Sequence, residues 1–212
     1  SDSNSGIALS ISSNNYISNV VANSNVNYGI ILSTFSMNNQ LSNITANSNS
    51  DIGIIVATSS NNNLSNIVAN SNSLYGIYIS SSSNNTIQNG GINDSKQDAI
   101  FITTSPSGNR NNLLRNITIT NTNSSFNDVK WNVASINGTI LENMPHIGNY
   151  TFTGSGGTII VKDSRYGEVK FLDAIGGSGT NFTNDIRIGN NSATVLSSSN
   201  SGLNKSESSL FV

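Results

Sequence analysis

An internal repeat of 23 to 24 residues constrains this chain more than any other feature. Each unit opens with a short apolar segment, and the units extend well past the middle of the chain. The opening segments are Gly6–Leu9, Gly29–Leu32, Gly53–Val56, Gly76–Ile79 and Ala99–Ile102. A second set of apolar positions follows: Ile17, Leu41, Leu64, Ile87 and Leu114. A third set is Ala22, Ala46, Ala69, Ile92 and Ile119. A fixed period of this length predicts stacked repeats.

The apolar runs are too short for helices and alternate with a period of two, which predicts strands. We therefore expect an all-β fold, a right-handed, single-stranded parallel β-helix with about five regular coils and three strands per coil. The columns that start at Ile7 and Leu9 should point inward, with coils about 4.8 Å apart. A leucine-rich horseshoe or a low-complexity linker is the alternative. The missing helical segment and the orderly columns disfavour both.

Asparagine recurs two residues after the second apolar position of each unit. These residues are Asn19, Asn43, Asn66, Asn89 and Asn116. We interpret the column as an inward asparagine ladder inside a turn, in which side-chain amides bond their copies above and below. The glycine that opens most units is expected to adopt a backbone conformation that other residues avoid.

The pattern loosens after Ile102, where a loop with Pro106 and Gly108 interrupts it. We divide the chain into regular coils over residues 1–124 and an irregular β continuation over 125–212. Alternation from Val129 to Val195 supports continued coils with longer connections. A small β-sandwich beginning near residue 125 is the competing interpretation.

Composition excludes several classes of function. Only 9% of residues are charged and the formal net charge is −2, so no basic field would attract nucleic acid. No apolar run approaches the roughly 20 residues that a membrane-spanning helix needs. The chain has no cysteine, which removes disulfides and thiol chemistry.

Two strings carry a family resemblance. Residues 75–80 (YGIYIS) and 83–89 (SNNTIQN) resemble the parallel β-helix repeats of carbohydrate-binding and sugar-hydrolase-like proteins. Similar repeats occur in the periplasmic copper-maturation protein of nitrous oxide reductase and in archaeal cell-surface proteins, which this chain resembles most in style. The resemblance implies the fold. It leaves the activity open, because one fold hosts many functions.

Carboxylates are scarce in the regular coils, and glycoside hydrolysis requires a pair about 5–10 Å apart. Asp51 and Asp98 precede equivalent strand starts but lie two coils apart, with Tyr75 between them. Asp94, Lys96 and Asp98 are expected to cluster near Arg110 and Arg115 as a surface ion-pair network. We therefore predict no catalytic residues and no enzyme.

Metal ligands are equally scarce. Soft copper sites require Met, His or Cys, and the chain offers Met37, Met144 and His146. Two ligands in the Met144–His146 segment are insufficient, so no metal and no cofactor are predicted.

One outward column is apolar: Ile31, Ile55, Tyr78 and Phe101. A contiguous exposed stripe of this kind would mark an interface, unless the C-terminal segment folds back over it. Among N-x-[ST] sequons, we expect glycans at the loop residues Asn123, Asn137 and Asn181. Asn43 and Asn116 are excluded by their place in the inward ladder.

These features together predict an extracellular, non-catalytic structural protein, a subunit of a surface layer, sheath, filament or adhesin that associates with copies of itself. The alternative is a carbohydrate-binding or carbohydrate-active β-helix, in which flat polar faces and outward Tyr78 or Tyr16 contact sugars. Glycans are then the expected partner.

Overall fold

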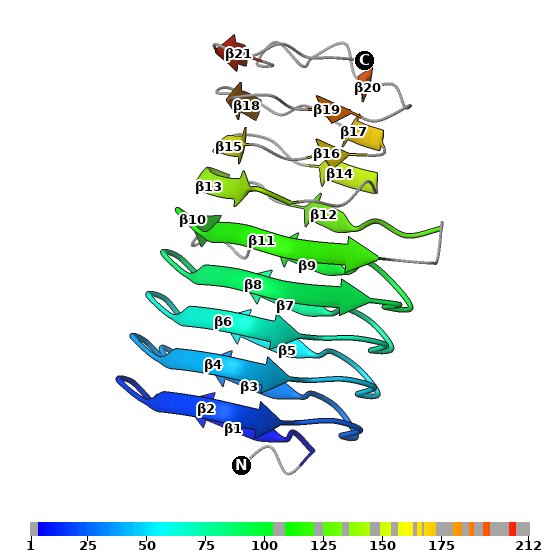
Figure 1. Cartoon of the computed structure of the whole chain (residues 1–212). Helices are drawn as coiled ribbons and strands as arrows, with labels where there is room; N and C mark the ends of the chain where they lie inside the picture. Colours follow the sequence, from blue (N-terminus) through cyan, green and yellow to red (C-terminus); the bar gives the residue numbers. More distant parts are fainter. Residues whose placement is uncertain are drawn as a thin grey trace.

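The chain forms a parallel β-helix in which each coil stacks on the one before it (Figure 1). The computed structural model describes residues 4–103, 109–120, 125–132, 136–144, 149–153, 157–162, 165–166, 168–172, 180–183, 187–188, 193–195 and 204–206. Every strand pair among them is parallel, and like residues stand in register, as Ile7, Ile30 and Ile54 do. The predicted right-handed β-helix with about five regular coils is confirmed.

Two long sheets run the length of the stack. The first sheet contains β1 (Ile7–Ser10), β3 (Ile30–Ser33), β5 (Ile54–Ala57), β7 (Ile77–Ser80), β9 (Ile100–Thr103), β12 (Val129–Asn132), β14 (Asn149–Thr153), β17 (Glu168–Leu172) and β20 (Ala193–Val195). The second contains β2 (Tyr16–Val21), β4 (Gln40–Thr45), β6 (Asn63–Val68), β8 (Thr86–Asn93), β11 (Leu113–Thr120), β13 (Ile136–Glu142), β15 (Gly157–Lys162), β18 (Thr180–Thr183) and β21 (Asn204–Ser206), with β10 (Asn109–Arg110) beside β13. A third, small sheet pairs β16 (Arg165–Tyr166) with β19 (Arg187–Ile188).

The regular coils contain two strands each, so the prediction of three is wrong. The second apolar position and the residues after it belong to one strand of the second sheet. In β4 this strand bends at Asn43, which has a φ of 54°. The left-handed conformation reverses the side-chain alternation locally, and Leu41 and Ile44 therefore both point inward. Asparagine tolerates this conformation better than most residues do.

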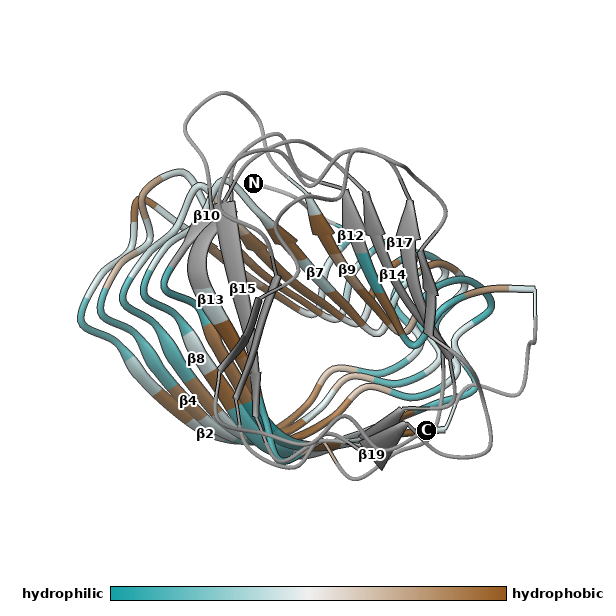
Figure 2. Ribbon diagram, turned by 90° about the horizontal axis from the view of Figure 1, so that it is seen from above, coloured by the Kyte–Doolittle hydropathy of each residue, from teal (hydrophilic) through white to brown (hydrophobic). Residues whose placement is uncertain are grey.

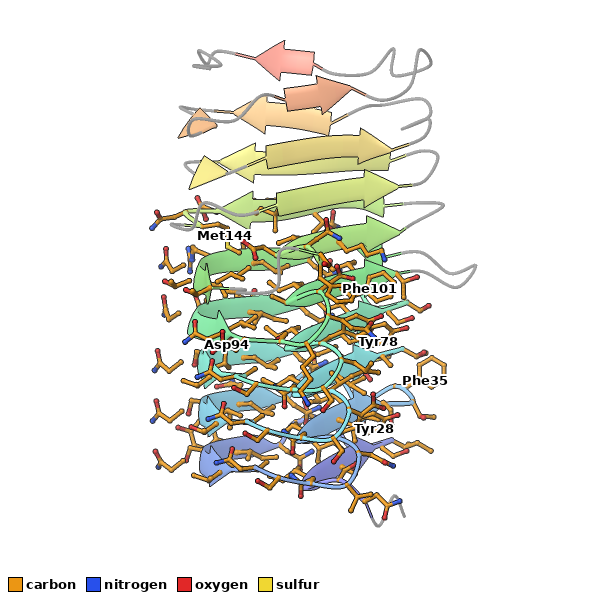
Figure 3. All side chains as sticks on the ribbon, turned by 90° about the vertical axis from the view of Figure 1, so that its right-hand side faces the viewer. Tyr28, Phe35, Tyr78, Asp94, Phe101 and Met144 are labelled. Carbon is orange, nitrogen blue, oxygen red and sulfur yellow. The ribbon has the colours of Figure 1, made fainter. Side chains whose placement is uncertain are left out.

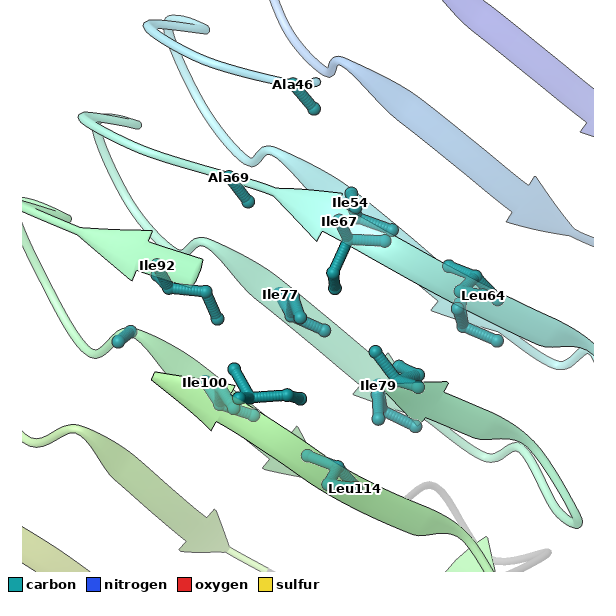
Figure 4. Close-up of a cluster of buried hydrophobic side chains, with 14 of the residues drawn as sticks. Ala46, Ile54, Leu64, Ile67, Ala69, Ile77, Ile79, Ile92, Ile100 and Leu114 are labelled. Carbon is teal, nitrogen blue, oxygen red and sulfur yellow. The ribbon is translucent and has the colours of Figure 1, made fainter. Parts of the chain in front are cut away.

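Stacked aliphatic side chains fill the space between the two sheets (Figure 4), and the hydropathy colouring of the ribbon shows apolar residues along both sheets (Figure 2). Ile30, Ile54, Ile77 and Ile100 form one fully buried column, as the sequence predicts. Burial of each aliphatic side chain contributes roughly 1.5–3 kcal/mol to the free energy of folding. Because the same positions are buried in successive coils, this contribution is repeated in each coil.

The predicted asparagine ladder exists as a hydrogen-bonded column but lies on the outside. The Asn43 Nδ2 donates to Asn19 Oδ1 at 3.0 Å, and the Asn66 Nδ2 donates to Asn43 Oδ1 at 3.1 Å. Asn116 likewise donates to Asn89 at 3.0 Å. Asn19, Asn43, Asn66 and Asn89 are exposed and Asn116 is half-buried. The inward placement is therefore wrong, because the left-handed backbone turns these side chains out of the core.

The buried ladders are formed by other asparagines. One lies in the turn that leads from the first sheet to the second, and its members are Asn15, Asn39, Asn62, Asn85 and Asn112. Each residue donates from its backbone N and its Nδ2 to the Oδ1 of the next, at 2.8–3.1 Å. A second ladder, Asn25, Asn49 and Asn72, lies in the turn that leads back to the first sheet.

The glycine column adjoins this second ladder. A Cβ on Gly29 would stand 2.8 Å from Asn49 Nδ2 and 2.6 Å from the Gly53 carbonyl oxygen. The glycines therefore give room to the ladder amide and to the next coil. Glycine is therefore required at these positions for lack of space, and not for the unusual backbone conformation that the sequence suggested.

The C-terminal strands continue the same two sheets. β12 pairs with β9 on one side and β14 on the other, and β13 pairs with β11 and β15. These parallel pairings extend the helix, and they contradict an appended β-sandwich. Figure 1 shows the described strands of this part stacked above the regular coils, not laid over their sides.

Candidate functional site

The outer face of the first sheet and the turn just before it hold most of the aromatic and charged side chains of the described coils. Tyr28, Ile52, Tyr75 and Asp98 occupy equivalent positions, each one residue before the column that opens the repeat. Figure 3 shows Tyr28, Tyr78 and Phe101 on the same side of the stack at successive heights.

Three rings form a contiguous platform on this face. The Tyr75 and Tyr78 rings are stacked, with centroids 6.0 Å apart and planes at 15°. The Phe101 ring is tilted against both, with its centroid 5.0 Å from that of Tyr75 and 5.7 Å from that of Tyr78. The platform thus combines residues from two columns and two adjacent coils, and all three side chains are half-buried.

The predicted apolar stripe of Ile31, Ile55, Tyr78 and Phe101 is interrupted in the structure. Ile55 is only 5% exposed, so the prediction of a contiguous exposed stripe is wrong at its centre. Ile55 stands in register between Ile31 and Tyr78, and these large side chains flank it. Ile31, Tyr78 and Phe101 are each half-buried. The face is consequently an aromatic surface and not an aliphatic one.

Lys130 and Asp98 border the platform on the C-terminal side. The Lys130 Nζ lies 5.5 Å from the centre of the Phe101 ring and 3.6 Å from Asp98 Oδ2. Asp98 is buried, and its Oδ1 accepts hydrogen bonds from both the backbone N and the Nδ2 of Asn127 at 2.8 Å. Asp98 is therefore occupied in joining two coils, whereas the Lys130 side chain, 38% exposed, can reach a ligand.

Asp51 and Tyr28 border the platform on the N-terminal side. Burial raises the pKa of Asp51, and a hydrogen bond from the Tyr28 side chain partly offsets that increase. Burial also raises the pKa of Tyr75, with further contributions from the charges of Asp98, Tyr78 and Asp51. Tyr75 therefore keeps its phenolic proton at neutral pH, because tyrosine ordinarily titrates near 10. Tyr75 therefore offers a hydroxyl donor, and Asp51, whose charge acts on it, offers a carboxylate acceptor.

Two members of the predicted charged cluster around Asp94 have partners outside it. Asp98 pairs with Lys130 and Asn127. Arg115 instead lies on the second sheet, where it donates to Gln88 Oε1 at 2.5 Å and stands 3.8 Å from Glu142. In the view of Figure 3, Asp94 lies at the edge opposite Tyr78 and Phe101. The Arg110 side chain is outside the described residues.

The glycosylation candidates fall in different places from those expected. Asn137 lies in strand β13 and Asn181 in strand β18, so neither is a loop site. Asn123 is outside the described residues. The exclusion of Asn43 on grounds of burial is also wrong, because its side chain is exposed.

Sequence reasoning missed the role of Lys130 and the identity of the buried ladders. The ladder had a visible signal, namely the Asn-Asn pairs 14–15, 38–39, 61–62, 84–85 and 111–112, one per coil. The contact of Lys130 with Asp98 had no visible signal in the sequence. Ala99 stands opposite Asp128 in the next coil, 29 positions further along the chain instead of 23 or 24. That spacing breaks the period on which the alignment depends.

Two comparisons place the chain among known proteins. Residues 1–156 match the sequence model of the family described as periplasmic copper-binding protein (NosD). A search of curated proteins finds no match. The periplasmic description agrees with the expected location outside the cytoplasm. Within the described part of the chain, no helix has the length and apolar character needed to cross a membrane.

The fold is similar to that of a solved enzyme module. The A-module of mannuronan C-5 epimerase AlgE6 from Azotobacter vinelandii matches with a TM-score of 0.61 and 17% sequence identity. The match covers 98% of this chain and 55% of the module, so the chain spans about half the module's length. At this identity the likeness establishes the fold.

This comparison contradicts the prediction that the chain is not an enzyme. That prediction relied on the absence of carboxylates clustered along the sequence. In a solenoid, however, residues far apart in the chain meet on one face, as Asp51, Tyr75 and Asp98 do here. The two matches are to a periplasmic family and to an enzyme module with this fold, and neither is described as a structural subunit.

The family description names copper, and the described residues do not fit that metal. Met144 is fully buried in the core, and Met37 lies in a different coil. The chain has no cysteine, and its one histidine, His146, is outside the described residues. Within the described ranges, no three His, Cys, Asp or Glu residues stand close enough to hold a metal ion.

Proposed function

The chain belongs to the family of the periplasmic copper-binding protein NosD, and from this premise we propose that it is a carbohydrate-recognising β-helix that works outside the cytoplasm. The proposed binding surface is the outer face of the first sheet, with Tyr75, Tyr78 and Phe101 as its centre. The observation that carries the proposal is the contact of these three half-exposed rings on a rigid sheet, with Asp51 and Lys130 at opposite ends.

Sugar rings have apolar faces of C–H groups and a rim of hydroxyls. Aromatic rings pack against the apolar faces, whereas carboxylates and amides bond the rim. Asp51 supplies an acceptor, Tyr75 a donor and Lys130 a cation around the platform. Because every one of these residues is fixed to a coil of the stack, little conformational entropy is lost on binding.

Catalysis at the same face is the second candidate function. It is favoured by the partly buried Asp51 carboxylate with its raised pKa and by the protonated Tyr75, whose pKa responds to the charge of Asp51, since perturbed pairs of this kind mark sites of proton transfer. Asp98 takes no part in this candidate, because Asn127 and Lys130 already occupy both of its oxygens. Any reaction would therefore depend on Asp51 and Tyr75 and not on two free carboxylates.

The proposal is tested by calorimetric titration with a charged polysaccharide, mannuronan, and with a neutral glucan. We expect Tyr78→Ala to weaken binding about tenfold, which corresponds to the roughly 1.4 kcal/mol expected for one lost aromatic contact. Phe35→Ala is the matched control, because Phe35 is 59% exposed and makes no ring contact with the platform. Absence of binding to either polymer, or equal losses in both variants, would remove the proposal.

The same mixtures are then assayed for change in the polysaccharide by proton NMR. Turnover that disappears in Asp51→Asn and Tyr75→Phe while binding persists would establish the second candidate. Turnover that survives both substitutions would rule out Asp51 and Tyr75 as its source.

A further inference from the structure

Part of the aromatic platform and the cation beside it stand in one column of the first sheet. Tyr78 pairs in register with Phe101, and Phe101 pairs in register with Lys130. The column continues with Thr151 in β14. Neighbouring strands of a sheet lie about 4.8 Å apart, and the coils are stacked one above another (Figure 1), so the column follows the axis of the stack. Two aromatic positions are therefore followed, one coil further on, by a positive charge.

The ammonium group of Lys130 is held in place by two contacts that do not use its hydrogen bonds. Its Nζ lies 5.5 Å from the centre of the Phe101 ring and 3.6 Å from Asp98 Oδ2. The second distance is that of an ion pair and is too long for a hydrogen bond. An ammonium group has three N–H donors, and within the described part of the chain none of the three has an acceptor. Because 38% of the side chain is exposed, Lys130 can present these donors to a ligand.

An acidic group suits this cation better than a neutral one. Hydrogen bonds from an ammonium to a carboxylate are roughly twice as strong as those between neutral groups. The side chain of Asp98 is only 2% exposed and is neutralised by Lys130 itself, so it repels an incoming anion weakly. Asp51 lies in the turn before β5, three strands from Lys130 in β12, which is about 14 Å along the stack. That distance exceeds the screening length of about 8 Å at physiological ionic strength.

We propose that the outer face of the first sheet binds a glycan that carries acidic groups and lies along the axis of the stack. One sugar unit packs on the aromatic rings, and the acidic group of an adjoining unit binds Lys130. This inference rests on the proposed carbohydrate-recognising function and names the class of carbohydrate. The rings bind the apolar face of any sugar unit, whereas Lys130 selects the acidic polymer.

Two polymers that differ only in charge test the selectivity on the unaltered protein. They are mannuronan and the same polymer after its carboxyl groups have been reduced to alcohols. In calorimetric titration at low salt, we expect mannuronan to bind at least about fivefold more tightly, with a smaller difference at 1 M salt because screening shortens to about 3 Å. Equal affinities would overturn the inference and leave the proposed function intact. Absence of binding to both polymers would overturn both.

A loss of charge at Lys130 tests which residue is responsible. Lys130→Met should bind the two polymers equally, with the affinity for the reduced polymer unchanged, and Lys130→Arg should restore the preference. The matched control is Arg115→Met, which removes the same charge from the second sheet and should keep the preference. Equal losses in Lys130→Met and Arg115→Met would assign the preference to total charge and overturn the inference. The comparison of the two polymers on the unaltered protein does not depend on the folding of these variants.

A gain of charge tests the direction in which the glycan lies. Thr151→Lys adds a cation at the next position of the same column, and Ser65→Lys adds one on the second sheet. A polymer that follows the column gains a further contact from the first substitution only. We therefore expect Thr151→Lys to bind mannuronan about threefold more tightly and Ser65→Lys to bind it as the unaltered protein does. Equal affinities of the two variants would reject binding along the axis and overturn the inference.

Discussion

The two turns of each coil carry buried asparagine ladders of unequal length. The ladder that starts at Asn15 runs through all five regular coils to Asn112, whereas the one that starts at Asn25 ends at Asn72. Its next position is Ser95, whose buried hydroxyl has no hydrogen-bond partner. The same turn geometry is therefore filled in two ways, and the difference reveals what the asparagine does.

The change at Ser95 accompanies a change at a neighbouring column. Ala22, Ala46 and Ala69 are followed by Ile92, which is fully buried. Where an asparagine amide lies against Gly6, Gly29 and Gly53, the Ile92 Cγ2 lies against Gly76. Ile92 thus fills with carbon the space that an amide fills in the earlier coils. The asparagine there serves both as a hydrogen-bonding group and as a packing volume.

Breaking the continuous ladder should have the largest effect. In Asn62→Leu, the Asn39 backbone N and Nδ2 lose the Asn62 Oδ1 acceptor, and the Ser36 carbonyl oxygen and Asn85 Oδ1 lose the Asn62 Nδ2 donor. Because several buried polar groups are affected at once, we expect the free energy of unfolding to fall by at least about 3 kcal/mol. Equilibrium urea denaturation measures it. A loss below about 1 kcal/mol would mean that water replaces the amide at this turn.

Restoring the interrupted ladder should have an intermediate effect that depends on its neighbour. Ser95→Asn alone should destabilise by about 1–3 kcal/mol, since Ile92 already occupies the amide's space. Combined with Ile92→Ala it should recover most of that loss. A double-mutant cycle should give a favourable coupling of at least about 1 kcal/mol between the two positions. Additive effects of the two substitutions would mean that residues 92 and 95 act independently, and would contradict the explanation that Ile92 fills the space of the asparagine amide.

Substitution on the outer ladder should have the smallest effect. Asn66 is exposed and adopts a φ of 52°. Asn66→Leu should therefore cost about 1 kcal/mol, mainly from the left-handed backbone. Asn66→Gly, which keeps the conformation without the amide, should change stability by less than that, because glycine adopts this conformation readily. If Asn66→Gly costs as much as Asn62→Leu, the distinction between inner and outer ladders fails.

Periodicity alone predicted the main columns of the fold. Ile7, Ile30 and Ile54 stand in register as expected, because identical residues at one spacing can stack in only one way. The side on which Asn43 lies could not be predicted, since it stands two residues after the inward Leu41 and strict alternation would turn it inward. The left-handed backbone at that position reverses the alternation, and the sequence pattern contains no separate sign of it.

The candidate site was only partly predictable. Tyr75 and Asp98 could be placed in one column from the repeat, and Tyr78 and Phe101 in the next. The contact between Tyr75 and Phe101 joins the two columns through side-chain orientation, which spacing does not define. Asn127 and Lys130 bind the two oxygens of Asp98. These partners could not be predicted, because they lie in an irregular coil that breaks the spacing of the repeat.

The ladders also have a direction, and this has an electrical consequence. In the buried ladders each amide donates toward the following coil, as Asn15 does to Asn39, whereas in the outer ladder Asn43 donates back to Asn19. Rows of aligned amide dipoles add up along their axis. Here the inner and outer rows point in opposite directions, so their moments partly cancel. Each coil that extends the stack adds to both rows, and a long, nearly uncharged rod can therefore grow without accumulating a large axial dipole.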